Sequence, residues 1–313
     1  MAFFGVTPPL ILPTAELPFI YSIDGSPPSN ASFPDPIPPT YRQWFTSATL
    51  PEGKHTIKLS KLTASIDFAV VAVGKDTDIS GERVIVDDDD PGVKYGGTWR
   101  NNRDRFSFAD AIGFNFANSS HETSYVGNTV TYRFSGQSSR FLSPTKFLQN
   151  RFEPGTAIAI YGEFDYSSIG LLTLTFLLDG QPLSQSYRVT ATSPEYVSKL
   201  GQQPNYLFYS FDFLTRGVHT LVINVTECVD QTFRLDYLTY VPAFARVSEM
   251  PADLLHGNTT TGSGSLPTSS GEHGKTYAGI AVGAILGAVV IALGMFLCFR
   301  RKAALWTKYS PRK

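Results

Sequence analysis

Short runs of apolar residues, or of alternating apolar and polar residues, recur through residues 1–245 in the manner of β-strands. Asp-Gly pairs at 24–25 and 179–180 predict tight turns between strands, because glycine tolerates a positive φ. A single helical turn is predicted, at Pro194–Leu200. Many short strands separated by Gly and Pro predict an all-β antiparallel sandwich of the jelly-roll type. The clearest strand runs are Val130–Phe134, Ala157–Tyr161, Leu171–Leu178 and His219–Val225.

A different pattern appears at Tyr277–Phe299, which is 23 residues long and carries no charged side chain. A helix of that length measures about 34 Å and would cross a hydrocarbon core of about 30 Å. The flanking segment after it begins with Arg300, Arg301 and Lys302. Because basic residues favour the inner side, the tail 300–313 is predicted to be cytoplasmic and the preceding residues extracellular. A buried core helix is the alternative, but such helices are seldom this long or apolar on every side.

The residues that precede this apolar run agree with placement outside the plasma membrane. Residues 246–276 are predicted to form a stalk, since His256–Thr276 is rich in Gly, Ser and Thr and has almost no large apolar side chain. Four N-x-[ST] sequons lie before the apolar run and predict N-glycosylation. These sequons are at Asn30, Asn118, Asn224 and Asn258.

An internal repeat divides the residues before the stalk into a segment 1–75, a linker 76–82 and a segment 83–245. The later copy has Val84–Ile160 in front of its repeated elements, and the first copy has nothing equivalent. The first segment is therefore predicted to be a partial sandwich and the second a complete one. The initial residues resemble a secretory signal poorly, so we expect the sequence to begin inside a longer protein. The matched segments are Phe4-Gly5 with Tyr161-Gly162, Tyr21–Gly25 with Phe176–Gly180, Gly53–Ile57 with Gly217–Leu221, and Phe68–Val73 with Phe233–Leu238.

Composition excludes several classes of protein. The 26 basic and 27 acidic residues give a formal net charge of −1, so there is no overall basic character of the kind that binds nucleic acid. Two cysteines exclude a disulfide scaffold and a zinc module built on paired CxxC motifs. Aromatic residues make up 13% of the chain, which is enough for a packed core and argues against global disorder.

The order of several motifs resembles one group of proteins. Val86–Tyr95, Gly97–Trp99 and Ser120–Thr123 are followed by the IYG, LDG, GxHTL and FRLDYLTY elements of the second repeat. This set is similar to basidiomycete-type fungal single-pass surface proteins with tandem galactose-binding-like jelly rolls, a Ser/Thr stalk and a C-terminal transmembrane helix. The resemblance implies that architecture, and it implies little about activity.

The acidic run Asp87–Asp90 is a candidate calcium site, because hard cations prefer several oxygen ligands. Neighbouring side chains in an extended segment point apart, however, so four consecutive carboxylates cannot converge on one ion. A solvated turn that opens the sandwich is predicted here instead, and neither a metal nor a cofactor is expected.

Histidines and further acids are the candidates for catalysis. His55 and His219 share one repeat position, which predicts a structural role in which a ring nitrogen bonds a neighbouring loop. His121 beside Glu122 would imitate a base with an orienting acid, although no nucleophile motif accompanies it. A glycosidase pair stays open, because the sequence does not show the separation of the carboxyl groups. The acids concerned are Asp110, Glu163, Asp165 and Asp236, the last of which is expected at the end of the final strand.

Tyr95, Trp99 and Arg100 are the candidate ligand-binding residues. Aromatic rings stack on the C–H faces of sugars, and polar neighbours bind the hydroxyls. The alternative is that these rings belong to the core.

In the apolar run, Gly279, Gly283 and Gly287 share one helix face, which favours a homodimer through close helix packing. Glycine is also common in membrane spans without that role.

Together these features predict a non-catalytic, single-pass surface glycoprotein that binds or senses cell-wall or extracellular carbohydrate. Two alternatives remain. One is an adhesion or spacer protein that binds protein partners, and the other is the membrane-anchored remnant of a glycoside-active enzyme.

Overall fold

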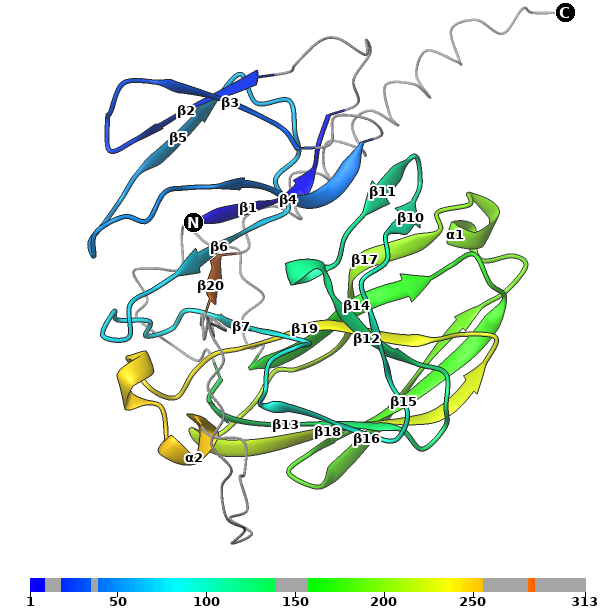
Figure 1. Cartoon of the computed structure of the whole chain (residues 1–313). Helices are drawn as coiled ribbons and strands as arrows, with labels where there is room; N and C mark the ends of the chain where they lie inside the picture. The colour runs from blue at the N-terminus through cyan, green and yellow to red at the C-terminus, as the bar shows by residue number, and fades with distance from the viewer. Residues whose placement is uncertain (9–17, 35–38, 139–156, 256–280, 285–313) are drawn as a thin grey trace, which may run out of the picture.

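The computed structural model describes residues 1–8, 18–34, 39–138, 157–255 and 281–284, and these form three β-sheets with a few single helical turns (Figure 1). The all-β sandwich class predicted from the sequence is confirmed, and Pro194–Val197 supplies the expected helical turn. Strand pairing is antiparallel except between β4 and β11. In chain order the elements are β1 (Ala2–Val6), β2 (Pro18–Ile23), β3 (Ser29–Ser32), β4 (Thr40–Thr46), β5 (Ile57–Ser60), β6 (Phe68–Ala72), β7 (Val84–Asp87), β8 (Val93–Gly96), β9 (Arg100–Asn102), β10 (Phe106–Phe108), β11 (Ala111–Gly113), η1 (Phe116–Asn118), β12 (Ser120–Thr123), β13 (Thr129–Gly136), β14 (Ile158–Asp165), β15 (Gly170–Leu178), β16 (Gln181–Val189), α1 (Pro194–Val197), β17 (Gln202–Phe211), β18 (Gly217–Val229), β19 (Phe233–Tyr240), η3 (Val247–Glu249), α2 (Ala252–Leu255) and β20 (Ala281–Ala284).

Strands β1–β6, which we call the N-terminal unit, make a small two-layer sandwich. One layer is β4-β1-β6 and the other is the three-stranded sheet β3-β2-β5. Aromatic rings fill the space between the layers. Phe3 stacks on Trp44 with the ring centroids 5.6 Å apart, and Phe19 meets Trp44 edge-on with the centroids 5.4 Å apart. Phe33 and Phe45 complete this buried cluster.

Strands β7–β19, which we call the second unit, make a larger sandwich. Its five-stranded sheet, ordered β16-β15-β18-β13-β8, packs on a layer that contains β7, β12, β14, β17 and β19. Strand β15 shows the alternation that such packing requires, since Leu172, Leu174 and Phe176 are fully buried and the residues between them are partly exposed. The apolar face of each strand therefore fixes which side of its sheet becomes core.

The pairing of strands is duplicated between the two units. β1 lies between β4 and β6 as β14 lies between β17 and β19, and β2 pairs with β3 and β5 as β15 pairs with β16 and β18. A register irregularity falls at the same place in each copy, after Phe3 in β1 and after Ile160 in β14. Within the described residues, the three-stranded sheet has no counterpart of β13 and β8.

The register corrects one detail of the repeat read from the sequence. Phe4 lies opposite Phe68, and Tyr161 lies opposite Tyr237, so Phe68 corresponds to Tyr237 and not to Phe233. Gly162 packs so closely on the neighbouring strand that an added Cβ would lie 1.8 Å from a carbonyl oxygen. A second correction concerns Asp236, which lies inside β19 and not at its end.

One polar clamp occurs in both copies and ties the Asp-Gly turn to the segment of the histidine, which is the start of β18 in the second unit and the residues just before β5 in the N-terminal unit. His219 lies 2.7 Å through Nδ1 from the Asp179 carboxylate and 2.8 Å through Nε2 from the Thr215 carbonyl oxygen. The Thr220 N–H donates to the other Asp179 oxygen at 2.8 Å. His55 repeats these contacts with Asp24 and Pro51, each at 2.7 Å. The structural role predicted for both histidines is confirmed.

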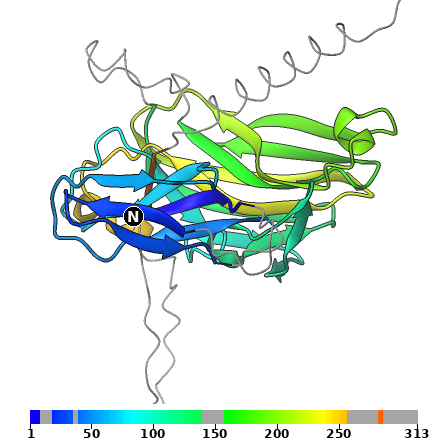
Figure 2. The same ribbon diagram turned by 90° about the horizontal axis from the view of Figure 1, so that it is seen from above.

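The two units lie side by side along one twelve-stranded sheet (Figures 1 and 2). The hairpin β10–β11 of the second unit pairs through Ile112 and Gly113 with β4 of the N-terminal unit. On the other edge, β20 pairs with both β6 and β7. An apolar cluster joins the units, because Phe4, Phe68 and Tyr237 are buried together.

The predicted membrane span is described only at Ala281–Ala284, where the sequence predicts helix and the structure has the strand β20. The rest of Tyr277–Phe299, including Gly279 and Gly287, lies outside the described residues, as do the tail and most of the stalk. No helix in the described part of the chain combines the length and the apolar character needed to cross a bilayer.

We predict that His219→Ala destabilises the protein by about 2 kcal/mol, because the buried ring contacts two oxygen atoms and its removal leaves them without a partner. His55→Ala is the matched comparison and should cost less, since the His55 side chain is 24% exposed and the His219 side chain is 6% exposed. Urea unfolding of the two variants measures the loss in free energy of unfolding for each. Equal losses would contradict the role of burial.

Candidate functional site

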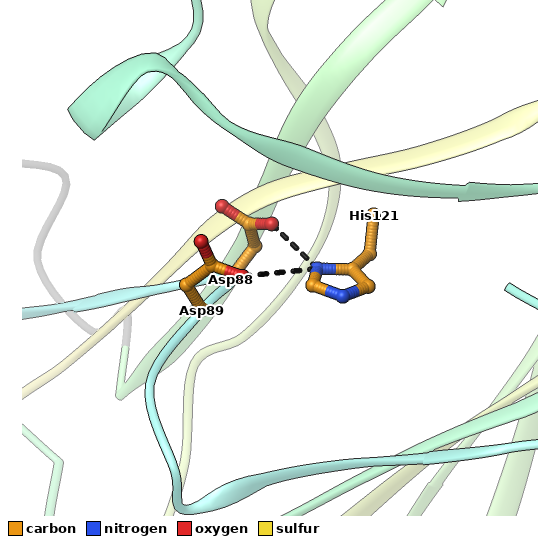
Figure 3. Close-up of side chains that lie close together, drawn as sticks. All are labelled: Asp88, Asp89 and His121. Carbon is orange, nitrogen blue, oxygen red and sulfur yellow. Dashed lines mark hydrogen bonds and ion pairs between the residues drawn. The ribbon is translucent and has the colours of Figure 1, made fainter. Parts of the chain in front are cut away.

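A histidine–carboxylate pair lies where β7 ends and β12 takes its place along the same edge of β19. His121 Nδ1 is 2.6 Å from Asp88 Oδ2 and 3.9 Å from Asp89 Oδ1 (Figure 3). Asp88 is buried, and its second oxygen accepts a 2.8 Å hydrogen bond from the Ser119 hydroxyl. The partner of His121 is therefore Asp88 and not the adjacent Glu122, which the sequence offered only as an imitation of an orienting acid. Successive residues of a strand point to opposite faces, which already separates these two side chains.

Tyr95 packs against one face of the His121 imidazole ring. Its ring stacks on His121 with the centroids 4.0 Å apart, and its hydroxyl donates to the Asp88 carbonyl oxygen at 2.8 Å. Because Tyr95 belongs to β8 and His121 to β12, the stack connects the two sheets of the second unit. Burial raises the pKa of the Tyr95 hydroxyl far above its usual range, so the hydroxyl remains a hydrogen-bond donor.

The cluster of Asp88, Asp89 and His121 has the chemistry of a cation site, with one ligand atom from each residue within 4.8 Å of the others. The hydrogen bonds argue against that use. Both Asp88 oxygens are bonded, and the Asp89 oxygens accept from Asn101 at 2.6 Å and Arg103 at 3.0 Å. A cation held by these three residues would have to compete with Ser119, Asn101 and Arg103, which already donate to the two carboxylates, so the residues fit a hydrogen-bond network better than a metal centre.

The solvated turn predicted for Asp87–Asp90 is wrong at Asp88. Burial raises the pKa of Asp88, although His121 and Ser119 lower it. Burial and the neighbouring Asp88 and Asp89 charges raise the pKa of Asp87 to about 8. Asp87 therefore holds a proton at neutral pH, which relieves the crowding of three consecutive carboxyl groups.

Opposite charges alternate across four strands of the twelve-stranded sheet. Glu122 of β12 lies opposite both Arg100 of β9 and Arg234 of β19, and Arg234 lies opposite Glu163 of β14. The Arg100–Glu122 contact measures 2.6 Å, and Arg234 reaches Glu122 at 3.0 Å and Glu163 at 3.4 Å. Arg100 is the exposed end of this row, and Glu163 is its buried end.

Buried carboxyl groups also hold the segment Asn115–Ser120 against the sheet. Asp236 accepts the Phe116 N–H at 2.8 Å, and Asp88 accepts the Ser119 hydroxyl. Burial raises the pKa of Asp236 well above its usual range, and the Asp88 and Asp87 charges raise it further. Burial likewise raises the pKa of Glu163 to about 7, against the lowering effect of Arg234.

This arrangement does not form a solvent-facing pair of carboxyl groups from the candidate glycosidase acids. Glu163 and Asp236 are buried, and Asp110 is exposed in the turn between β10 and β11. Asp165 lies at the end of β14, where it contacts Arg234 at 3.9 Å. These placements favour structural roles for Glu163 and Asp236.

The predicted ligand residues come together, but they differ in exposure. Trp99 packs edge-on against Phe233 at 5.9 Å and lies 5.0 Å from Tyr95, and its indole N–H donates to the Gly96 carbonyl oxygen. The partly buried rings of Tyr95 and Trp99 therefore also serve the core, which was the alternative reading. The Arg100 side chain is 62% exposed and is held by Glu122.

The remaining predicted sites are distributed over the surface and the chain ends. Asn30 in β3 and Asn118 in η1 are exposed, whereas Asn224 in β18 is half-buried and its buried Oδ1 has no hydrogen-bond partner. Asn258 lies outside the described residues. Cys228 is half-buried, and its thiol contacts the Gln231 carbonyl oxygen at 2.9 Å.

No family model matches the chain, and no curated protein is similar to it in sequence. Three solved structures show limited likeness. A Paenibacillus cycloisomaltooligosaccharide glucanotransferase is 12% identical, with a TM-score of 0.29, 54% of this chain covered and 18% of the other. The CBM36-1 domain of a xylanase from the hindgut metagenome of Trinervitermes trinervoides is 12% identical, with a TM-score of 0.28 and coverages of 50% and 94%. A GH87 α-1,3-glucanase catalytic domain in complex with nigerose is 13% identical, with a TM-score of 0.32 and coverages of 54% and 29%. The chain thus spans less than a third of the first and third of these proteins.

We predict that Glu163→Gln flattens the pH dependence of stability. Because the folded-state pKa is raised from 4.5 to about 7, the contribution is fully present below pH 4.5 and is lost as pH rises through 7. The shift corresponds to roughly 3 kcal/mol across this window. Urea unfolding between pH 4 and 8 measures the slope. The exposed Glu227→Gln is the matched control, and equal slopes for the wild type and Glu163→Gln would contradict the prediction.

Proposed function

We propose that the second unit binds carbohydrate without acting on it chemically, and that the chain is a single-pass surface glycoprotein with galactose-binding-like jelly rolls. One observation carries the binding proposal. Arg100 directly follows Trp99 and is held by Glu122, while Asn101 and Arg103, farther along β9 and its loop, are held by Asp89. Fixed polar groups beside an aromatic ring suit the hydroxyls and C–H faces of a sugar.

The non-catalytic part of the proposal is supported by the burial and the hydrogen bonds of the acidic residues and of His121. The groups with strongly raised pKa values are engaged in packing and hydrogen bonds, as Asp236 is with the Phe116 N–H. His121 has its Nδ1 against Asp88, and its ring is covered on one face by Tyr95. A carboxyl group whose pKa is raised because it is buried and hydrogen-bonded within the fold does not need a catalytic role to explain that pKa.

The membrane part of the proposal is supported by the sequence, and it requires Ala281–Ala284 to leave the edges of β6 and β7, where they pair as β20, and to enter the bilayer as part of a helix. Tyr277–Phe299 is apolar throughout and is followed by a basic tail, which places the sandwiches outside the cell and the C-terminus in the cytoplasm. The exposure of Asn30 and Asn118 is compatible with N-glycans on the extracellular part. The glycine face of the span would allow a homodimer.

We predict that Arg100→Ala weakens binding to an immobilised cell-wall polysaccharide about tenfold, because a charged side chain that donates to sugar hydroxyls is removed. The full chain in detergent would be titrated against insoluble β-1,3-glucan, chitin and mannan. Arg133→Ala, an exposed arginine of the five-stranded sheet, is the matched control and should bind as the wild type does. Absence of binding to every polysaccharide, together with capture of a protein partner, would instead support the adhesion alternative.

A separate prediction concerns the anchor. The full chain expressed in a eukaryotic cell should stay with the membrane pellet after extraction with alkaline carbonate, because the apolar run would be inserted in the bilayer. Deletion of residues 285–299, which keeps the β20 residues Ala281–Ala284, should release it to the supernatant. Recovery of the intact chain in the supernatant would reject the anchor without affecting the sugar-binding proposal.

A further inference from the structure

We infer that Tyr125, at the end of the second unit next to Trp99, is the ring on which the bound sugar stacks. This inference rests on the proposed carbohydrate-binding function and identifies its contact surface. Tyr125 is 64% exposed, whereas the rings of Tyr95 and Trp99 are packed against the core. A sugar face needs an accessible ring, so exposure favours Tyr125 over the two residues that the sequence suggested.

The loop that carries Tyr125 is held in a fixed shape. The Tyr125 N–H donates to the Thr123 hydroxyl at 3.2 Å, and its carbonyl oxygen accepts the Asn128 N–H at 3.3 Å. Gly127 has φ of 89°, a conformation that favours glycine, and its N–H donates to Val225 at 2.8 Å. An exposed ring on a constrained backbone loses little conformational entropy when it binds a ligand.

The same hydrogen bonds place this loop beside the Trp99 loop. The Thr98 carbonyl oxygen accepts from the Thr123 hydroxyl at 3.0 Å and from the Asn128 side-chain amide. Thr98 directly precedes Trp99 and the first residue of β9, Arg100, so the loop of Tyr125 adjoins the segment that leads into β9. A ligand stacked on Tyr125 would thus lie near the polar groups of β9.

Other exposed apolar side chains extend the surface at this end of the sandwich. Val126 is 60% exposed, Val229 is 51% exposed and Ile169 is 47% exposed. Their loops are joined, because Ser124 contacts Thr232 at 3.0 Å and the Gln231 amide donates to Ser168 at 2.7 Å. Gln231 is 5% exposed, and its Oε1 has no hydrogen-bond partner, which leaves an acceptor for a ligand hydroxyl or a bridging water.

The size and chemistry of this surface favour a sugar chain as its occupant. Four exposed apolar residues are far fewer than the 20–30 residues that each side of a standard protein interface contributes. The polar groups between the apolar side chains include the uncharged hydroxyls of Ser124 and Thr232. A neutral, hydroxylated ligand with an apolar face matches both features.

The test uses the full chain in detergent and the insoluble β-1,3-glucan, chitin and mannan already described. Tyr125→Ala should weaken binding about fivefold to tenfold, whereas Tyr125→Phe should stay within about twofold, because it keeps the ring. Tyr125→Leu should behave as Tyr125→Ala does, since it is apolar but has no flat face. Phe213→Ala removes a ring of similar exposure from the loop between β17 and β18 and should bind as the wild type does.

Thermal midpoints within 2 °C of the wild type, on the order of the scatter expected for a surface change, exclude misfolding as the cause. Unchanged binding by Tyr125→Ala together with weaker binding by Arg100→Ala would overturn the inference and leave the proposed function standing. Retained binding by Tyr125→Leu would overturn stacking in favour of general hydrophobic contact. Failure of the wild type to bind any of the polysaccharides would overturn both the inference and the proposed function.

Discussion

Unsatisfied strand edges are the constraint on which the arrangement of this chain depends. The layer β4-β1-β6 of the N-terminal unit has two outer edges, and backbone groups left unpaired there would be costly or would invite aggregation. Both edges are covered by strands from later in the chain, β11 on β4 and β20 on β6. In the second unit, β7 and β12 cover the corresponding edge of β19. The two units therefore share one continuous sheet.

The segment Asn115–Ser120 links the sheet shared by the two units to the buried carboxyl groups of the candidate site. Buried carboxyl groups of Asp88 and Asp236 accept its hydrogen bonds, and the hairpin before it pairs with β4. Phe116 from the same segment packs 5.3 Å from Phe4 of the N-terminal unit. The raised pKa values of Asp88 and Asp236 would suggest catalytic groups, but both carboxyl groups hold the segment that joins the two units. The surface that we propose for recognition is the end of the second unit, where the exposed Tyr125 lies on a hydrogen-bonded loop.

Local patterns predicted a large part of this structure. The alternation in β15 and the Asp-Gly turns specified strands and reversals, and the repeated position of His55 and His219 predicted the clamp. The pairing of His121 with Asp88 was missed, because these residues are 33 positions apart and meet only when β7 and β12 line up along the same edge of β19. Strand geometry alone would have rejected Glu122, since adjacent side chains point to opposite faces.

The sequence by itself determined the fold class, the duplicated order of strands and the turn chemistry, because these depend on neighbouring residues and on periodicity. It also defined the apolar run and its basic flank. Only the tertiary structure decided which edges are covered, which carboxyl groups are buried and which ring faces solvent. The sequence singled out Trp99 and not Tyr125, yet Trp99 packs on Phe233 and Tyr125 is exposed. That difference arises from contacts between segments distant in the chain, which no local pattern encodes.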